Sequence, residues 1–569
     1  MRAADQGLGI ASDRLDRLEV LVLSGLLILL NLRLGRLSTA LISRYSGSMN
    51  LMKAITTVGS YTMLSRVFGF ARDILVAAVL GAGSVADAFF VAFRFPNLFR
   101  RLFAEGAFAA AFVPIFSSIL EEEGRKKAKE MAEQVFAVLF VILVLFVALM
   151  ELAMPWAMWV LAPGFDEVEG KMAMATEMSR ITFPYLLFIS LVSLQSGVLN
   201  SLGRFGAAAA APVLLNLVLI AAMLGFRDAL ETPGHVLSWG VFAAGVVQFV
   251  WLIWHCKSAD FPLRLVLPRL SQKVRLLGRR ILPVVFGASL YQINLFIGTI
   301  LATLVADGAV SYLYYADRVT QLPLGVVGVA VGTALLPTLS RQLAAGEEMA
   351  AANSQNRGLE FALLLTLPAT AALLVIAMPI VTVLFERGAF GPVQTRATAD
   401  ALMAYATGLP AYVLIRVLTP GFFAREDTST PVRIAAAGMA VNIVLNLILM
   451  KVWGHVGIAL ASSVAAWVNA AALAVVLKRR GQLTIDSRLA QRGPKIVLAS
   501  AGMAACLFAG ERLVAPPCAG PCAANVPALV VLIFGGMVVF GGLAYILGAA
   551  RWSDLKGLRR PGSEEAGDA

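Results

Sequence analysis

The chain has 569 residues, of which 59% are hydrophobic and only 14% are charged, and its mean hydropathy is +0.80. This composition excludes an ordinary soluble domain, in which about 25% of residues are charged. The net charge of +12 would suit a nucleic-acid-binding protein, but the basic residues gather in connections on one predicted side of a membrane. We therefore expect a membrane protein with no nucleic-acid partner.

About fourteen apolar runs follow one another along the chain, and each is long enough to cross roughly 30 Å of hydrocarbon as a helix. The runs are continuously apolar rather than alternating, which favours helices over a β-barrel. They lie near residues 54–80, 86–120, 133–161, 177–202, 208–226, 235–255, 281–304, 310–340, 358–385, 400–423, 431–451, 455–477, 495–513 and 525–549. The sequence thus predicts an all-α polytopic membrane protein with about fourteen transmembrane helices.

Residues 1–48 differ from the rest of the chain. Their apolar stretch, 18–30, is flanked by Arg17 and Arg33 and is too short for a secure span. We interpret residues 1–48 as an N-terminal extension that is disordered or a start-site artefact, with the working protein beginning at Met49.

The distribution of basic residues predicts the orientation. If the N-terminus of the first span is cytoplasmic, the cytoplasmic connections and tail hold roughly twenty-six Lys and Arg, against about six on the other side. Both termini are then cytoplasmic. Cys518 and Cys522 fall in an outer loop, where an oxidising compartment would allow a disulfide, and whether one forms stays open.

Prolines recur at matching intervals in two halves of the chain, with offsets of 223, 224 and 226 residues. The pairs are Pro114 with Pro337, Pro155 with Pro379, and Pro184 with Pro410. Two lobes related by such a parallel repeat can rock against each other around a substrate site, so the repeat favours a transporter.

The repeat also predicts the domain organisation. We expect an N-lobe of six helices at 49–256 and a C-lobe of six helices at 257–480. Two additional helices and a cytoplasmic tail occupy 481–569.

Ionisable residues concentrate in two of the predicted spans, although a charge at the bilayer centre costs from about 3 to more than 10 kcal/mol. The first group comprises Arg66, Arg72, Asp73, Asp87, Arg94, Arg100, Arg101 and Glu105. A second group consists of Asp317 and Arg318, which by the repeat lie roughly where the second of these spans lies in the first half. These groups need water, ion partners or an anionic ligand.

We expect the arginines to line a cationic cavity between the lobes. Arginine binds phosphate in bidentate fashion, so the cavity suits a phosphate or pyrophosphate headgroup. The predicted binding residues are Arg72, Arg100 and Arg318, with Arg66, Arg94 and Arg101. In the alternative interpretation, some arginines extend to the interface or form internal ion pairs. Gating or ion pairing is predicted for Asp73, Asp87, Glu105 and Asp317.

Other polar residues in the spans give weaker signals. Asn294, Asn442 and Asn446 would suit a cation site, but such residues more often form hydrogen bonds between helices. The histidines, His235, His255 and His455, fall near span ends, which indicates interfacial packing. We predict no metal site, no cofactor and, because no P-loop, HExxH or GxSxG motif occurs, no enzymatic activity.

Several segments resemble the MurJ (MviN) family of lipid II flippases. They are MNLMK at 49–53, SRVFGFARD at 65–73, DAFFVAFR at 87–94, PNLFRRLFAEGAF at 96–108, YYADR at 314–318 and PGFFAR at 420–425. The resemblance runs from Met49 to about Arg551. It implies the fourteen-helix fold of the MOP exporter superfamily, with two six-helix lobes and two extra helices that form a lipid-facing groove.

The same resemblance implies translocation of undecaprenyl-pyrophosphate-linked peptidoglycan precursor, lipid II, to the outer leaflet of the bacterial cytoplasmic (inner) membrane. The family's essential cavity residues carry over to Arg66, Arg72, Asp87, Arg100, Arg101, Glu105 and Arg318, and Arg94 stands where many relatives have Lys. Lipid II, membrane lipids and cell-wall synthesis proteins are the implied partners. Coupling to membrane potential or to a cation gradient stays open. The alternatives are an exporter of another lipid-linked saccharide and a MATE-like small-molecule antiporter.

Overall fold

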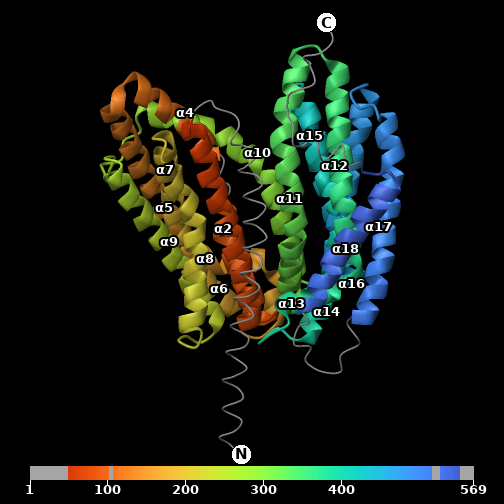
Figure 1. Ribbon diagram of the computed structural model, residues 1–569. Coiled ribbons are helices and arrows are strands. Elements are labelled where there is room, and N and C mark those ends of the chain that lie inside the picture. Colours follow the sequence, from red (N-terminus) through yellow and green to blue (C-terminus); the bar gives the residue numbers. More distant parts are fainter. Residues whose placement is uncertain (1–48, 101–106, 515–525, 551–569) are drawn as a thin grey trace, which may run out of the picture. The chain divides into compact units, whose positions relative to one another are not determined.

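The computed structural model describes residues 49–100, 107–514 and 526–550 (Figure 1). Within the helices, the description leaves out the side chains of 49–55, 107, 109–110, 282–295 and 326–334. The predicted extension 1–48, the Cys518–Cys522 pair, Arg101 and Glu105 lie outside the described residues.

All regular structure in the described residues is helical, so the predicted all-α polytopic fold is confirmed. In chain order the helices are α2 (Met49–Leu80), α3 (Ser84–Phe99), α4 (Ala107–Glu122), α5 (Gly124–Leu161), the 3₁₀-helix η2 (Pro163–Glu167), α6 (Lys171–Thr182), α7 (Tyr185–Ser201), α8 (Phe205–Phe226), α9 (Pro233–Ser258), α10 (Gln272–Thr303), α11 (Ala309–Ala344), α12 (Glu348–Val375), α13 (Ala377–Phe385), α14 (Pro392–Ala406), α15 (Leu409–Phe423), α16 (Ser429–Arg479), α17 (Ser487–Val514) and α18 (Val526–Ile546). Nine helical segments of this described part are long and apolar enough to cross a membrane, and the count of fourteen stays a prediction.

The helices form two compact units. The first contains the chain up to Leu80 and Ala88–Ile293, and the second contains Gly81–Asp87 and the chain from Asn294 onward. In the first unit α8 packs against α2 and α9, and α7 packs against α4 and α9. In the second unit α11 packs against α12, α14 and α15, while α17 lies between α12 and α18. The lobe limits drawn from the proline repeat stay predictions.

Several predicted apolar runs consist of two helices in tandem. Pro184 stands between α6 and α7, and Pro410 lies in the first turn of α15, directly after the break that ends α14. These prolines form one of the repeat pairs, so a helix break recurs at the matching place in each half. Proline causes such breaks because it lacks the backbone N–H that continues a helix.

One face of α5 carries the exposed apolar side chains expected of a helix that contacts lipid. Five large apolar side chains with exposed fractions of 61–73% alternate at intervals of four and three residues, which places them in one stripe. They are Leu145, Leu149, Leu152, Trp156 and Trp159. A continuous exposed apolar surface of this kind indicates contact with lipid.

A buried carboxylate joins α17 to α12 in the second unit. Glu360 of α12 accepts a hydrogen bond from Nη1 of Arg492 at 2.6 Å, and Nε of Arg488 lies 3.2 Å from its other oxygen. Arg357 pairs with both Glu360 and Asp486. The start of α17 is therefore fixed by charge as well as by apolar packing.

The replacement Glu360→Gln is expected to lower the thermal unfolding temperature of the detergent-purified protein. Removing one partner of a buried ion pair costs about 3 to 5 kcal/mol, because the opposite charges stay buried without compensation. Glu347→Gln, at an exposed position just before α12, is the control and should leave the unfolding temperature nearly unchanged. Equal unfolding temperatures for the two variants would show that the Glu360 cluster does not stabilise the fold.

Candidate functional site

Arg72 and Asp73 of α2 form a buried ion pair in the first unit. Nη2 of Arg72 lies 2.7 Å from Oδ1 of Asp73, and Nε of Arg72 lies 3.1 Å from the same oxygen. The two residues are 8% and 3% exposed. Adjacent residues on a helix do not face each other, so the long arginine side chain has to fold back toward its neighbour. The charges of Arg72 and Asp73 therefore compensate each other inside the first unit.

Asn216 of α8 fixes the same guanidinium from a second helix. Its Oδ1 accepts a hydrogen bond from Nη1 of Arg72 at 2.9 Å, while its Nδ2 donates to the carbonyls of Ser65 and Pro212, each at 3.1 Å. The amide therefore orients Arg72 and also joins α8 to α2. Sequence reasoning missed Asn216, although an amide in the middle of the apolar run 208–226 was an available signal.

Pro96 changes the hydrogen bonding of α3 next to the predicted arginines. A proline cannot donate to the carbonyl four residues earlier, here that of Ala92. Thr182 of α6 supplies the missing donor, because its Oγ1 lies 3.0 Å from that carbonyl oxygen. Directly after the proline, Asn97 accepts a hydrogen bond from Nε of Arg100, one turn later, at 2.9 Å. A second helix thus satisfies the carbonyl that Pro96 leaves without a donor, and the residue after the proline orients an arginine.

The remaining predicted arginines of α2 and α3 differ in exposure. Arg66 is exposed on α2, whereas Arg94 is half-buried on α3. Arg72, Arg100, Arg66 and Arg94 all belong to the first unit. The structure brings Arg72 directly together with Asp73 and Asn216, and the role of these arginines in binding substrate stays a prediction.

In the second unit, fully buried Asp87 caps the start of α11. Its Oδ2 accepts the backbone N–H of Gly308 at 2.8 Å, and its Oδ1 accepts the N–H and the hydroxyl of Ser311 at 2.9 and 2.6 Å. Helix N-termini carry unsatisfied N–H groups and a partial positive charge, so a carboxylate is the favoured partner there. Asp87 precedes the donors by more than 220 residues, which is why capping rules applied to local sequence do not find it.

The rest of the segment 81–87 is fixed in the same way. Tyr315 of α11 donates its hydroxyl to the carbonyl of Gly81 at 3.0 Å, and Ser84 donates to Asp307 at 2.9 Å. Gly81 has φ = +65°, and a Cβ atom there would lie 2.4 Å from the carbonyl oxygen of Ala389. Only glycine fits this position, so the segment lies directly beside the connection between α13 and α14, while the side-chain contacts hold it at the start of α11.

Asp317 and Arg318 lie half-buried on α11, also in the second unit. The guanidinium of Arg318 stands over the ring of Tyr314, 4.7 Å from its centre, at the separation typical of a cation–π contact. Asp317 accepts a hydrogen bond from Nε2 of Gln321 at 3.3 Å. Tyr314 therefore orients Arg318 from one turn earlier in the helix.

The asparagines considered for a cation site form hydrogen bonds within α16. Nδ2 of Asn446 donates to Oδ1 of Asn442 at 3.0 Å, and Asn442 in turn donates to Ser462 at 3.4 Å. The bond between Asn442 and Ser462 joins the two halves of α16 on either side of its break at Gly454. The side chain of Asn294 is among those left undescribed.

Known proteins resemble this chain over most of its length. The profile of the family described as "Lipid II flippase MurJ" matches residues 76–516. A probable lipid II flippase MurJ of Rhizobium meliloti (strain 1021) is 46% identical over 516 residues, which cover 89% of this chain and 96% of that relative. The lipid II flippase MurJ of Burkholderia cenocepacia is 38% identical over 440 residues, with coverages of 76% and 85%.

Solved structures support the same fold. A lipid II flippase MurJ in an inward closed conformation matches with a TM-score of 0.73 at 24% identity, covering 88% of this chain and 99% of that one. An inward-facing multidrug resistance MATE family transporter of the MOP superfamily matches with a TM-score of 0.63 at 16% identity, covering 75% and 98%. At these identities the likeness shows the fold alone.

The replacement Asp87→Ala is expected to destabilise the protein by about 2 to 4 kcal/mol, because it leaves two buried backbone N–H groups and one hydroxyl without their carboxylate. Asp87→Asn retains an acceptor oxygen and should lose less. Thermal unfolding of the purified variants measures both effects. If Asp87→Ala unfolds at the wild-type temperature, the cap is not important for stability.

Proposed function

The chain belongs to the lipid II flippase MurJ family, and we propose that it carries lipid II from the inner to the outer leaflet of the cytoplasmic membrane by alternating access. Lipid II here means the undecaprenyl-pyrophosphate-linked precursor of peptidoglycan. The protein is a multi-pass membrane transporter and not an enzyme. Cytoplasmic N- and C-termini are part of the proposal and rest on the positive-inside bias.

The observation that carries the proposal is the orientation of Arg72 inside an apolar helix. Burying a guanidinium costs several kcal/mol, so its place inside α2 needs a reason beyond apolar packing. Asp73 and Asn216 hold it in one geometry. Arginine's planar fork is the side-chain group that suits bidentate binding of a phosphate oxygen pair.

Other arginines supply further positive charge for the headgroup. We assign direct contacts with the pyrophosphate to Arg72, Arg100 and Arg318, assisted by Arg66, Arg94 and Arg101. Asn97 and Tyr314 support two of them by orienting Arg100 and Arg318. Asp87, Glu105 and Asp317 are assigned to gating or ion pairing.

Movement of the two units as packed bodies exposes the headgroup first to the cytoplasm and then to the outside. Their separate packing and the helix breaks at matching prolines support rocking of this kind. The undecaprenyl tail stays in lipid beside α17 and α18. The Glu360 cluster keeps α17 attached to its unit during the movement.

Net transport needs a source of energy, and we assign it to the membrane potential. One elementary charge that crosses 100 mV gains about 2.3 kcal/mol. The hydrogen-bonded pair Asn442 and Asn446 contains no carboxylate, and a carboxylate is the usual ligand for a bound cation. A cation gradient is therefore the less favoured source.

Replacement of Arg318 by Ala is expected to reduce the appearance of lipid II in the outer leaflet at least tenfold, while the protein still inserts in the membrane. Arg72→Lys, which retains the charge but loses the planar fork, should also reduce transport. Cells depleted of the wild-type protein and supplied with each variant provide the assay, with lipid II measured separately in each leaflet.

Arg433→Ala provides the matched control, since Arg433 is an exposed arginine near the start of α16. This variant should transport normally. Normal transport by Arg318→Ala and Arg72→Lys would overturn the assignment of these arginines to the headgroup. Normal lipid II distribution in depleted cells without any variant would overturn the flippase function itself.

A further inference from the structure

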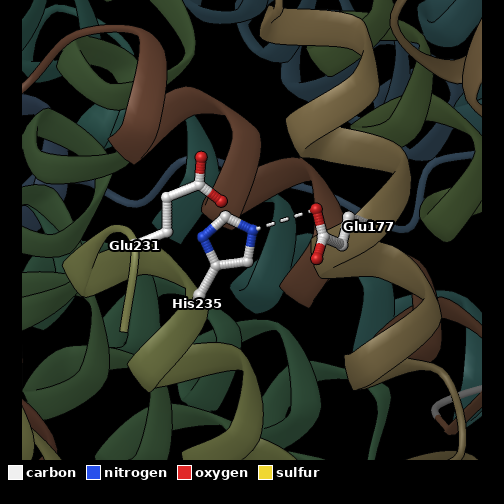
Figure 2. A group of neighbouring side chains, drawn as sticks. All are labelled: Glu177, Glu231 and His235. Atoms are coloured by element: carbon white, nitrogen blue, oxygen red, sulfur yellow. Dashed lines mark ion pairs between the residues drawn. The ribbon is translucent and has the colours of Figure 1, made fainter. Parts of the chain in front are cut away.

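Two carboxylates and a histidine meet at one end of α9 in the first unit (Figure 2). Glu177 comes from α6, Glu231 from the connection between α8 and α9, and His235 from the first turn of α9. One ligand atom from each residue lies within 4.8 Å of the others. The side chains of Glu177 and Glu231 approach the imidazole from opposite sides in Figure 2.

The imidazole ring of His235 is fixed in an orientation that suits a metal ligand. The residue is only 5% exposed, and its Nδ1 lies 2.8 Å from Oγ1 of Thr232. The tautomer with its proton on Nδ1 donates that proton to Thr232 and directs the lone pair of Nε2 toward Glu177. Nε2 has no hydrogen-bond partner among the described residues and lies 3.5 Å from Oε2 of Glu177.

We propose that Glu177, Glu231 and His235 bind a divalent transition-metal ion, and that the ion is zinc. One imidazole and two carboxylates form a ligand set that suits zinc, whereas calcium and magnesium prefer oxygen ligands alone. In a tetrahedral zinc site, neighbouring ligand atoms are roughly 3.3 Å apart. Both glutamates are exposed and flexible, so their carboxylates can close the remaining gap around the fixed imidazole.

The hydrogen bond at the other ring nitrogen of His235 supports this assignment. A metal-binding histidine usually gives its other ring nitrogen to a hydrogen-bond partner that fixes the ring, and Thr232 has this position here. Thr232 is also the N-cap of α9, since its Oγ1 accepts the backbone N–H of His235 at 3.4 Å. The ring orientation is therefore tied to the start of a helix.

Bound zinc would join α6 to the start of α9. Such an ion stabilises the folded state by an amount that grows with the logarithm of its concentration relative to its dissociation constant. Fourth and further ligands would be water, because the site opens to solvent through its two exposed glutamates. The effect belongs to the fold of the first unit and does not depend on lipid II.

Zinc binding can be measured on the full-length protein purified in detergent with a tag that contains no histidine. After removal of metal with a chelator, zinc chloride is titrated while thermal unfolding and bound zinc are followed. We expect one zinc ion per chain and a rise of a few degrees in the unfolding temperature. His235→Gln should remove the rise and weaken binding at least tenfold, and Thr232→Val should weaken binding about 10- to 100-fold.

Matched variants distinguish a site from unspecific binding. The chain contains three histidines, so His455→Gln provides a control that should bind zinc as the wild type does. Glu177→Gln removes an exposed ligand without disturbing the core and should weaken binding. Equal affinity in the wild type, His235→Gln and Glu177→Gln would overturn the proposal, as would a wild-type protein that responds to calcium or magnesium but not to zinc.

Discussion

Every charge within a membrane helix has to be compensated locally, because hydrocarbon offers neither water nor counter-ions. The described residues show three ways of meeting this constraint. Arg72 is paired with its neighbour Asp73 and an amide from another helix. Asp87 is placed on the N-terminus of α11, and Glu360 is surrounded by arginines from two helices. Each solution also joins parts of the chain that are far apart in sequence.

Compensation of this kind explains why polar contacts, and not only apolar packing, determine where the helices lie. Apolar side chains gain little by leaving lipid for a protein interior that is equally apolar. A carboxylate that accepts three hydrogen bonds from one helix start has no comparable alternative in the bilayer. The segment 81–87 and the start of α17 are both fixed by such contacts, which are specific in position and direction.

The all-α fold could be predicted from the sequence because long apolar runs dominate it, and the helix break at Pro184 follows from the chemistry of proline. The residues that contact the buried charged groups could not be predicted in this way. Asn216 and Glu360 acquire their roles only when a second helix is packed beside them. His235 looked like an interfacial residue, because nothing in the local sequence shows that Glu177 lies next to its ring. Local patterns determine helices, whereas these contacts depend on tertiary structure.

The balance of charge in α2 and α3 bears on how an anionic headgroup would be carried. Across α2, α3 and the residue that follows α3, four arginines (Arg66, Arg72, Arg94 and Arg100) stand against two aspartates, so this set retains an excess of positive charge even with the Arg72–Asp73 pair formed. A pyrophosphate that binds there reduces the net charge of the complex. The free-energy cost of placing ions in a low-dielectric medium falls as their charges are neutralised. The arginines and the pyrophosphate therefore cost less at membrane depth when they are bound to each other than when they are separate. If acids neutralised all of these arginines, binding of the headgroup would bring no such gain. If no acid were present, the arginines would be too costly to bury while the site is empty.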